Sequence, residues 1–121
     1  MAAAQHFYMS AKNYTEKVFI PGTPSMTHGG VYNQANIPHG VTITAFFTRG
    51  DNDAAAGTEG TLKYATADGK SWILFSWDIP WGAESSWCNV TSSDDLSLVP
   101  TSWKGDAIIR QTVTLGINNQ L

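Results

Sequence analysis

Apolar and polar residues alternate along much of this chain, which is the pattern of β-strands with one buried face. In residues 41–47, valine, isoleucine and alanine alternate with threonine until two phenylalanines end the segment. Residues 61–66 alternate in the same way, and residues 71–78 are rich in aromatic and branched side chains. Together the patterns predict strands over residues 5–11, 17–20, 41–47, 61–66, 71–78, 86–91 and 107–115.

Turn residues separate these segments. Asp68-Gly69 lies between two of the predicted strands, and an Asp-Gly pair in that position is a strong local sign of a β-hairpin. Residues 12–15 are expected to join the first two strands in another hairpin. No window of helical length shows a 3.6-residue period. We therefore predict one all-β domain over residues 1–121, a β-sandwich of antiparallel strands.

The chain carries little charge, and its balance is weakly acidic. Charged residues make up 14% of the 121 residues, and the formal net charge is −3 at pH 7. No run of Lys or Arg is present to neutralise phosphates, which argues against nucleic acid and strongly anionic membranes as partners. A membrane partner is therefore expected to be neutral or zwitterionic.

Catalytic and metal-binding patterns are missing from the sequence. His6, His28, His39 and Cys88 show no metal-ligand spacing, and there is no nucleophile elbow or phosphate-binding glycine loop. Cys88 is the only cysteine, so it forms no internal disulfide, and we expect it to be a buried and unreactive thiol. We predict a protein that is not an enzyme and needs neither metal nor cofactor.

Tryptophans are concentrated in one short stretch. Four of the five lie within residues 72–87. Trp72 and Trp77 are assigned to the core, because they fall within a predicted strand. Trp81 follows that strand and lies between a proline and a glycine, so we expect it in a turn and displayed to a ligand.

Two classes of ligand suit a displayed aromatic site on an acidic β domain. Aromatic rings stack on sugars, or they hold a choline- or ethanolamine-type head group by cation–π contacts. In the second case Asp78 would accept hydrogen bonds from the ammonium, and Arg49 would bind a phosphate. Histidine charge changes between pH 5 and 8, so His6, His28 and His39 are candidates for tuning such binding with pH.

Two motifs resemble those of the aegerolysin family. Residues 77–82 read W-D-I-P-W-G, similar to the family's W-D-x-P-W-G turn, and residues 49–60 are similar to its acidic, glycine-containing loop. The motifs stand in the family's order and spacing, and Trp87 follows them. The resemblance implies a compact β-sandwich, similar to actinoporins, that binds membranes containing sphingolipids.

The resemblance also implies targets and a partner. Typical targets in the family are sphingomyelin with cholesterol, or ceramide phosphoethanolamine, and many members act with a larger, perforin-like protein of the MACPF class. We therefore predict the lipid-targeting component of a binary pore-forming cytolysin or insecticidal toxin. No signal peptide is visible, so we expect synthesis in the cytoplasm and action outside the cell on a target membrane. Homo-oligomerisation stays open, and the alternative function is a lectin-like, carbohydrate-binding module.

Individual positions carry over from the family. Asp78 and Trp81 match positions that contact the lipid head group. His6 stands where the family has a lipid-contacting tryptophan. Ala56 replaces a glutamate that bears on lipid choice, and Glu84 falls near a position that is often lysine. The predicted lipid-binding residues are Trp81, Asp78, Trp77, Glu59, Arg49, His6, His28 and Trp87.

Overall fold

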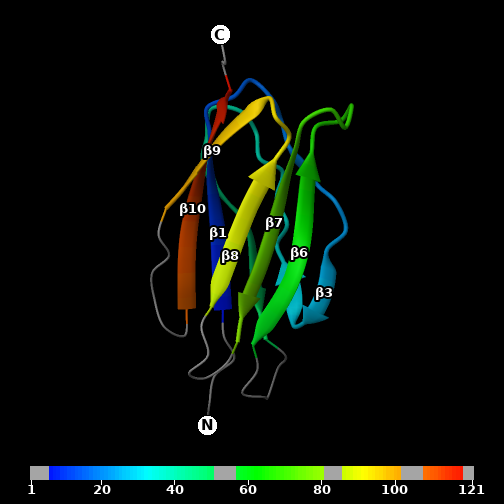
Figure 1. Cartoon of the computed structure of the whole chain (residues 1–121), viewed down its shortest axis with the longest axis vertical. Coiled ribbons are helices and arrows are strands. Elements are labelled where there is room, and N and C mark those ends of the chain that lie inside the picture. The colour runs from blue at the N-terminus through cyan, green and yellow to red at the C-terminus, as the bar shows by residue number, and fades with distance from the viewer. Residues whose placement is uncertain (1–5, 51–56, 81–85, 102–107, 119–121) are drawn as a thin grey trace.

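The computed structural model describes residues 6–50, 57–80, 86–101 and 108–118, which form two β-sheets packed face to face (Figure 1). One sheet, here called the β1 sheet, has the strand order β4-β5-β1-β10-β9. The other, here called the β7 sheet, has the order β2-β6-β7-β8, and β3 also pairs with β6. The predicted all-β sandwich is confirmed.

The longer strands match the segments that alternation predicts. The β1 sheet contains β1 (His6–Asn13), β4 (Gly30–Tyr32), β5 (Thr42–Arg49), β9 (Leu96–Pro100) and β10 (Ile108–Ile117). The β7 sheet contains β2 (Ile20–Pro21), β3 (Ser25–His28), β6 (Thr58–Ala65), β7 (Trp72–Ile79) and β8 (Trp87–Ser92). Short strands β3, β4 and β9 have no counterpart in the prediction. No helix long and apolar enough to cross a membrane occurs in the described residues.

Two features of strand pairing differ from the prediction. β1 pairs with β10 in parallel, whereas only antiparallel strands were expected. Parallel neighbours need a long connection, and these two strands are separated by almost the whole chain. The first predicted hairpin is wrong, because β1 lies between β5 and β10 and does not pair with residues 17–20.

The chain leaves the β1 sheet through a turn built around Asn13. The Asn13 side-chain oxygen accepts hydrogen bonds from the Thr15 amide at 2.9 Å and the Thr15 hydroxyl at 2.6 Å. Its amide nitrogen donates to the carbonyl of Lys17 at 2.9 Å. Asparagine often forms such turns, and here the turn directs Ile20 to the opposite sheet, where it pairs with Ala65.

The core lies between the sheets and follows the period of two along each strand. On β7, Ile73, Phe75, Trp77 and Ile79 are buried, and the intervening residues face outward. Phe46 lies at the centre, with its ring 5.2 Å from that of Phe75. The predicted Asp-Gly hairpin joins β6 to β7, and its glycine has a φ of 74°, a conformation in which glycine is favoured.

Strand direction gives the sandwich two distinct ends. β1, β6, β8 and β10 begin at one end, and β5 and β7 finish there. We call it the basal end, and it lies at the bottom of Figure 1. The β6–β7 hairpin lies at the other, distal end. Most of the predicted lipid-binding residues are within two residues of a basal strand end.

Candidate functional site

Four polar or aromatic side chains form a row across the β7 sheet near the basal end. Glu59 on β6 is paired with His28 on one side and with Asp78 on the other. Asp78 is in turn paired with Trp87 on β8. All four face outward, away from the core. We call His28, Glu59, Asp78 and Trp87 the acidic row, and all four belong to the predicted lipid-binding set.

Two carboxylates oppose each other at the centre of this row. Glu59 and Asp78 are directly paired on neighbouring antiparallel strands, a position in which Cβ atoms lie about 5 Å apart. Like charges in that position destabilise a sheet. Among the described residues, no hydrogen bond or ion pair to either carboxylate relieves the repulsion. The site therefore favours a cationic ligand.

The ends of the row add aromatic and titratable groups. The Trp87 side chain is 44% exposed on the edge strand β8, and His28 is exposed on β3. An exposed indole beside a carboxylate attracts an ammonium group, since the ring face and the carboxylate both carry negative charge. Sequence placed Asp78 and Trp87 near each other, but only strand pairing brings His28 beside Glu59.

Trp77 does not share this outer surface. Its side chain is fully buried, and its ring packs 5.3 Å from Phe46 and 6.4 Å from Phe7. The core assignment of Trp77 is therefore confirmed, and its place among the predicted lipid-binding residues is corrected. Trp72 shows the opposite error, because it is half-buried on the outer face with the Lys63 ammonium 5.0 Å from its ring.

A buried hydrogen-bond chain connects the two sheets directly beneath the acidic row. The Trp77 indole nitrogen donates to the Thr58 hydroxyl at 3.2 Å. The Thr58 hydroxyl in turn bonds to the hydroxyl of Thr48 on β5. Thr58 precedes Glu59 and Thr48 precedes Arg49, so this chain fixes the backbone beneath both charges. Sequence alone gave no sign of it, because the contact depends on which strands face each other.

Arg49 and His6 lie at the basal end but on the opposite outer face. They are paired with each other across β5 and β1 in the β1 sheet. The Arg49 guanidinium lies 5.0 Å from the Tyr32 ring, and its Nε is buried without a hydrogen-bond partner among the described residues. The predicted lipid-binding residues are thus divided between the outer faces of the two sheets. His39 lies near the distal end, beside the start of β5.

Several predicted positions lie outside the described residues. Trp81, Ala56 and Glu84 are among them, so the proposed display of Trp81 stays a prediction. Within the described residues, no group of three or more His, Cys, Asp or Glu side chains is placed to hold a metal ion.

Cys88 lies on β8 next to Trp87, with its side chain partly covered by the core. Burial raises the pKa of the Cys88 thiol to about 12, above the ordinary value of about 8.5. The thiolate is the reactive form, so the thiol is poorly nucleophilic at neutral pH. This supports the predicted unreactive cysteine.

Iodoacetamide should therefore modify native Cys88 slowly. At pH 8 we expect a rate at least about tenfold below that of the urea-unfolded chain, because little thiolate is present in the folded state. The rate is measured by mass spectrometry over time. Equal rates in the native and unfolded chains would contradict the burial assigned to this thiol.

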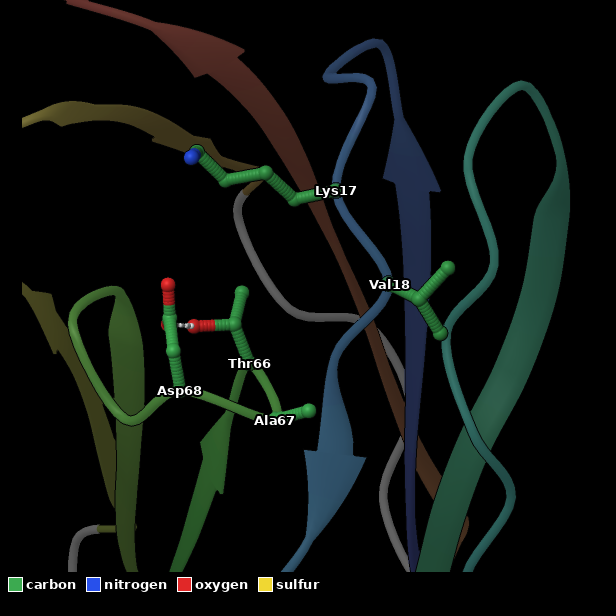
Figure 2. A pocket seen from close by; sticks show the side chains of 5 residues that line it. All are labelled: Lys17, Val18, Thr66, Ala67 and Asp68. Carbon is green, nitrogen blue, oxygen red and sulfur yellow. Dashed lines mark hydrogen bonds between the residues drawn. The ribbon is translucent and has the colours of Figure 1, made fainter.

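The distal end carries a separate surface hollow of about 380 Å³, lined by Lys17, Val18, Thr66, Ala67 and Asp68 (Figure 2). Figure 2 shows the Thr66 hydroxyl bonded to the Asp68 carboxylate, at 2.7 Å. The Lys70 amide donates to the same carboxylate oxygen at 3.0 Å. The Thr66 hydrogen bond is the largest cause of the lowered pKa of Asp68. These bonds shape the hairpin turn, so we assign the hollow a structural role.

Comparison with known proteins identifies the family. The family model described as Aegerolysin matches residues 24–120. The chain belongs to the aegerolysin family. This aegerolysin is also similar to a solved structure, the crystal structure of the lipid binding protein Nakanori. The TM-score is 0.70 at 15% identity, with 94% of this chain and 72% of that chain covered, which shows a shared fold. No curated protein sequence matches this aegerolysin.

Proposed function

We propose that this aegerolysin binds membrane lipids whose head group ends in an ammonium, and that the acidic row holds the ammonium. The observation that carries the proposal is the opposed pair Glu59 and Asp78, which has no described partner and lies beside the exposed Trp87. A cation placed there relieves the carboxylate repulsion and contacts the indole face. Trp81, three positions after Asp78, is proposed as a second aromatic group.

The target class is proposed to be sphingolipid. Sphingomyelin ends in a quaternary ammonium and ceramide phosphoethanolamine in a primary one, and both suit a site that combines carboxylates with an indole. Both lipids are also zwitterionic, which fits a protein with a net charge of −3. A neutral sugar would make no use of the charge of the two carboxylates, so the carbohydrate-binding alternative gains less support.

Membership of the family supports a further part of the proposal. We propose that the protein is the lipid-targeting component of a binary pore-forming cytolysin or insecticidal toxin. In this role it acts outside the cell, and a larger MACPF-type protein supplies the pore. Release of a dye from vesicles only when both proteins are present would test this part separately from lipid binding.

Vesicle flotation tests the lipid proposal directly. We expect binding to vesicles of sphingomyelin with cholesterol or of ceramide phosphoethanolamine, and at least about tenfold weaker binding to phosphatidylcholine vesicles, a difference of about 1.4 kcal/mol. Phosphatidylcholine has the same head group as sphingomyelin, so this comparison tests the proposed sphingolipid class. The ammonium contact is tested by an excess of free choline, which should weaken vesicle binding. A glycan array serves as the comparison for the carbohydrate-binding alternative. Equal binding to all vesicles contradicts the proposed selectivity. Binding to glycans without binding to any vesicle favours the alternative.

A further inference from the structure

A continuous row of stacked side chains crosses the outer face of the β1 sheet. Tyr8, Phe47 and Tyr32 are paired in register on β1, β5 and β4, with ring centroids 5.1 Å and 5.4 Å apart. An arginine contacts each of the two tyrosine rings: the Arg110 guanidinium lies 4.8 Å from the Tyr8 ring, and that of Arg49 lies 5.0 Å from the Tyr32 ring. We call these five residues the arginine ladder.

The ladder presents guanidinium groups and ring edges to its surroundings. Neighbouring rings in the ladder are near parallel, at 20° and 28°, so each covers the face of the next. The faces are therefore occupied within the ladder and do not form a platform for sugar stacking. Each arginine is held over a ring, which restricts its motion and leaves guanidinium N–H groups for an anion. Arg110 is exposed and Tyr32 is 37% exposed.

Charge distinguishes this face from the rest of the protein. The strands of the β1 sheet carry three cationic side chains, Lys12, Arg49 and Arg110, and no carboxylate. The whole chain nevertheless has a net charge of −3. Since the acidic row lies on the β7 sheet, the described strand residues near the basal end carry opposite charge on the two outer faces. An anion is thus attracted to the ladder and a cation to the acidic row.

The ladder also lies at the right depth for a lipid head group. Arg49 is the last residue of β5, and Arg110 is the third residue of β10. Both therefore lie within about 7 Å of the basal strand ends, at a rise of about 3.3 Å per residue. The polar layer of one membrane leaflet is about 5–8 Å thick. A protein that docks on its basal end would place both arginines in this layer, and tyrosines favour the same depth.

We propose that the arginine ladder binds lipid phosphate groups in the membrane that the acidic row engages. This inference rests on the proposed function. The ammonium and phosphate of one head group are joined by only two carbon atoms, whereas the sheets are about 10 Å apart and the two rows face away from each other. The phosphates at the ladder therefore belong to different lipid molecules from the ammonium at the acidic row.

A bilayer surface is then required for the full affinity. Two contacts made by one rigid domain reinforce each other when the ligands are held on one surface. Soluble choline carries the ammonium without a phosphate and reaches only the acidic row, so it should bind weakly and independently of the ladder. Each arginine close to lipid phosphates adds to membrane affinity, and the gain is reduced by salt.

The experiment compares two double variants with the same change in charge. Arg49→Gln/Arg110→Gln removes the two guanidiniums of the ladder. Lys63→Gln/Lys70→Gln removes two cations of the β7 sheet and distal hairpin, including the Lys63 cation–π contact with Trp72 at 5.0 Å. We expect the ladder variant to bind sphingomyelin–cholesterol vesicles roughly tenfold or more weakly than the parent, because it loses the charge-assisted hydrogen bonds from the guanidiniums to lipid phosphates. The lysine variant should stay within about twofold, since its charges lie away from the proposed contact.

Further measurements separate the possible outcomes. Choline binding, followed by NMR, should be the same in the parent and both variants. The single variant Arg110→Gln, at an exposed position, gives a smaller loss of vesicle binding even if the double variant folds poorly. If the ladder variants bind vesicles as tightly as the lysine variant, the inference is overturned. A change in oligomeric state on removing the arginines also overturns it, in favour of a second copy as the ladder's occupant. If the parent binds no vesicle, the proposed function itself fails.

Discussion

The double variant Glu59→Gln/Asp78→Asn should lose most of its vesicle binding without losing stability. The two substitutions preserve side-chain size and remove the opposed charges at the centre of the acidic row. We expect binding to sphingomyelin–cholesterol vesicles to fall by at least about tenfold, because the trimethylammonium group loses its Coulomb attraction to the carboxylates, which is about 1–4 kcal/mol for unit charges about 4 Å apart near a protein surface. The free energy of unfolding should rise by up to about 1 kcal/mol, because like charges no longer face each other.

Opposite effects on binding and stability are characteristic of a binding site. Most surface substitutions change the free energy of unfolding by less than about 0.5 kcal/mol. Substitution of a residue that supports the fold usually lowers it. A charge pair that lowers the stability of the sheet is explained if the free energy of ligand binding offsets that loss. The acidic row therefore predicts a protein that becomes more stable on binding the ammonium.

A matched control tests whether charge alone explains the loss. Glu16→Gln/Asp94→Asn makes the same change in net charge at two exposed positions near the distal end. It should bind vesicles as the parent does. Urea unfolding followed by tryptophan fluorescence gives the stability of all three proteins. If the acidic-row variant binds normally, the head group lies elsewhere, and if it is markedly destabilised, the carboxylates serve the fold.

Local sequence patterns predicted which residues face the core but not which sheet a strand joins. The period of two on β7 correctly separates buried Ile73, Phe75 and Trp77 from outward Asp78. The same pattern exists in both sheets, so it does not reveal that β5 and β7 lie in different layers. Arg49 was therefore grouped with Asp78 as parts of one site, and the structure places them on opposite faces.

The pairings that sequence missed are short or distant in the chain. β3 and β4 have only four and three residues, too few for alternation to stand out. β9 ends in Pro100, and proline weakens a strand prediction. The parallel pair β1 and β10 joins the first and last strands, and no turn motif marks such a contact. The β4–β5 and β1–β10 pairings bring the side chains of the arginine ladder together, so the ladder was also missed.

Two tryptophans near the site should respond oppositely to replacement by alanine. Trp77 is fully buried and Trp87 is 44% exposed, although only ten positions separate them. We expect Trp77→Ala to lower the free energy of unfolding by about 3–5 kcal/mol, since it empties a large core site beside Phe46. We expect Trp87→Ala to lower the free energy of unfolding by less than about 1 kcal/mol, since the side chain is partly exposed. The same substitution should weaken vesicle binding, because it removes the aromatic end of the acidic row.

Trp77→Phe separates packing from hydrogen bonding in the core. It keeps an aromatic ring but removes the indole donor to Thr58, which should cost about 1–3 kcal/mol by leaving buried polar groups less satisfied. Urea unfolding gives these stabilities, and vesicle binding is compared per folded molecule. For Trp77→Phe we expect near-normal binding, since the ring does not reach the surface. If that variant loses lipid contact while staying folded, Thr58 and Thr48 transmit the position of Trp77 to Glu59, and the core beneath the acidic row is part of the site.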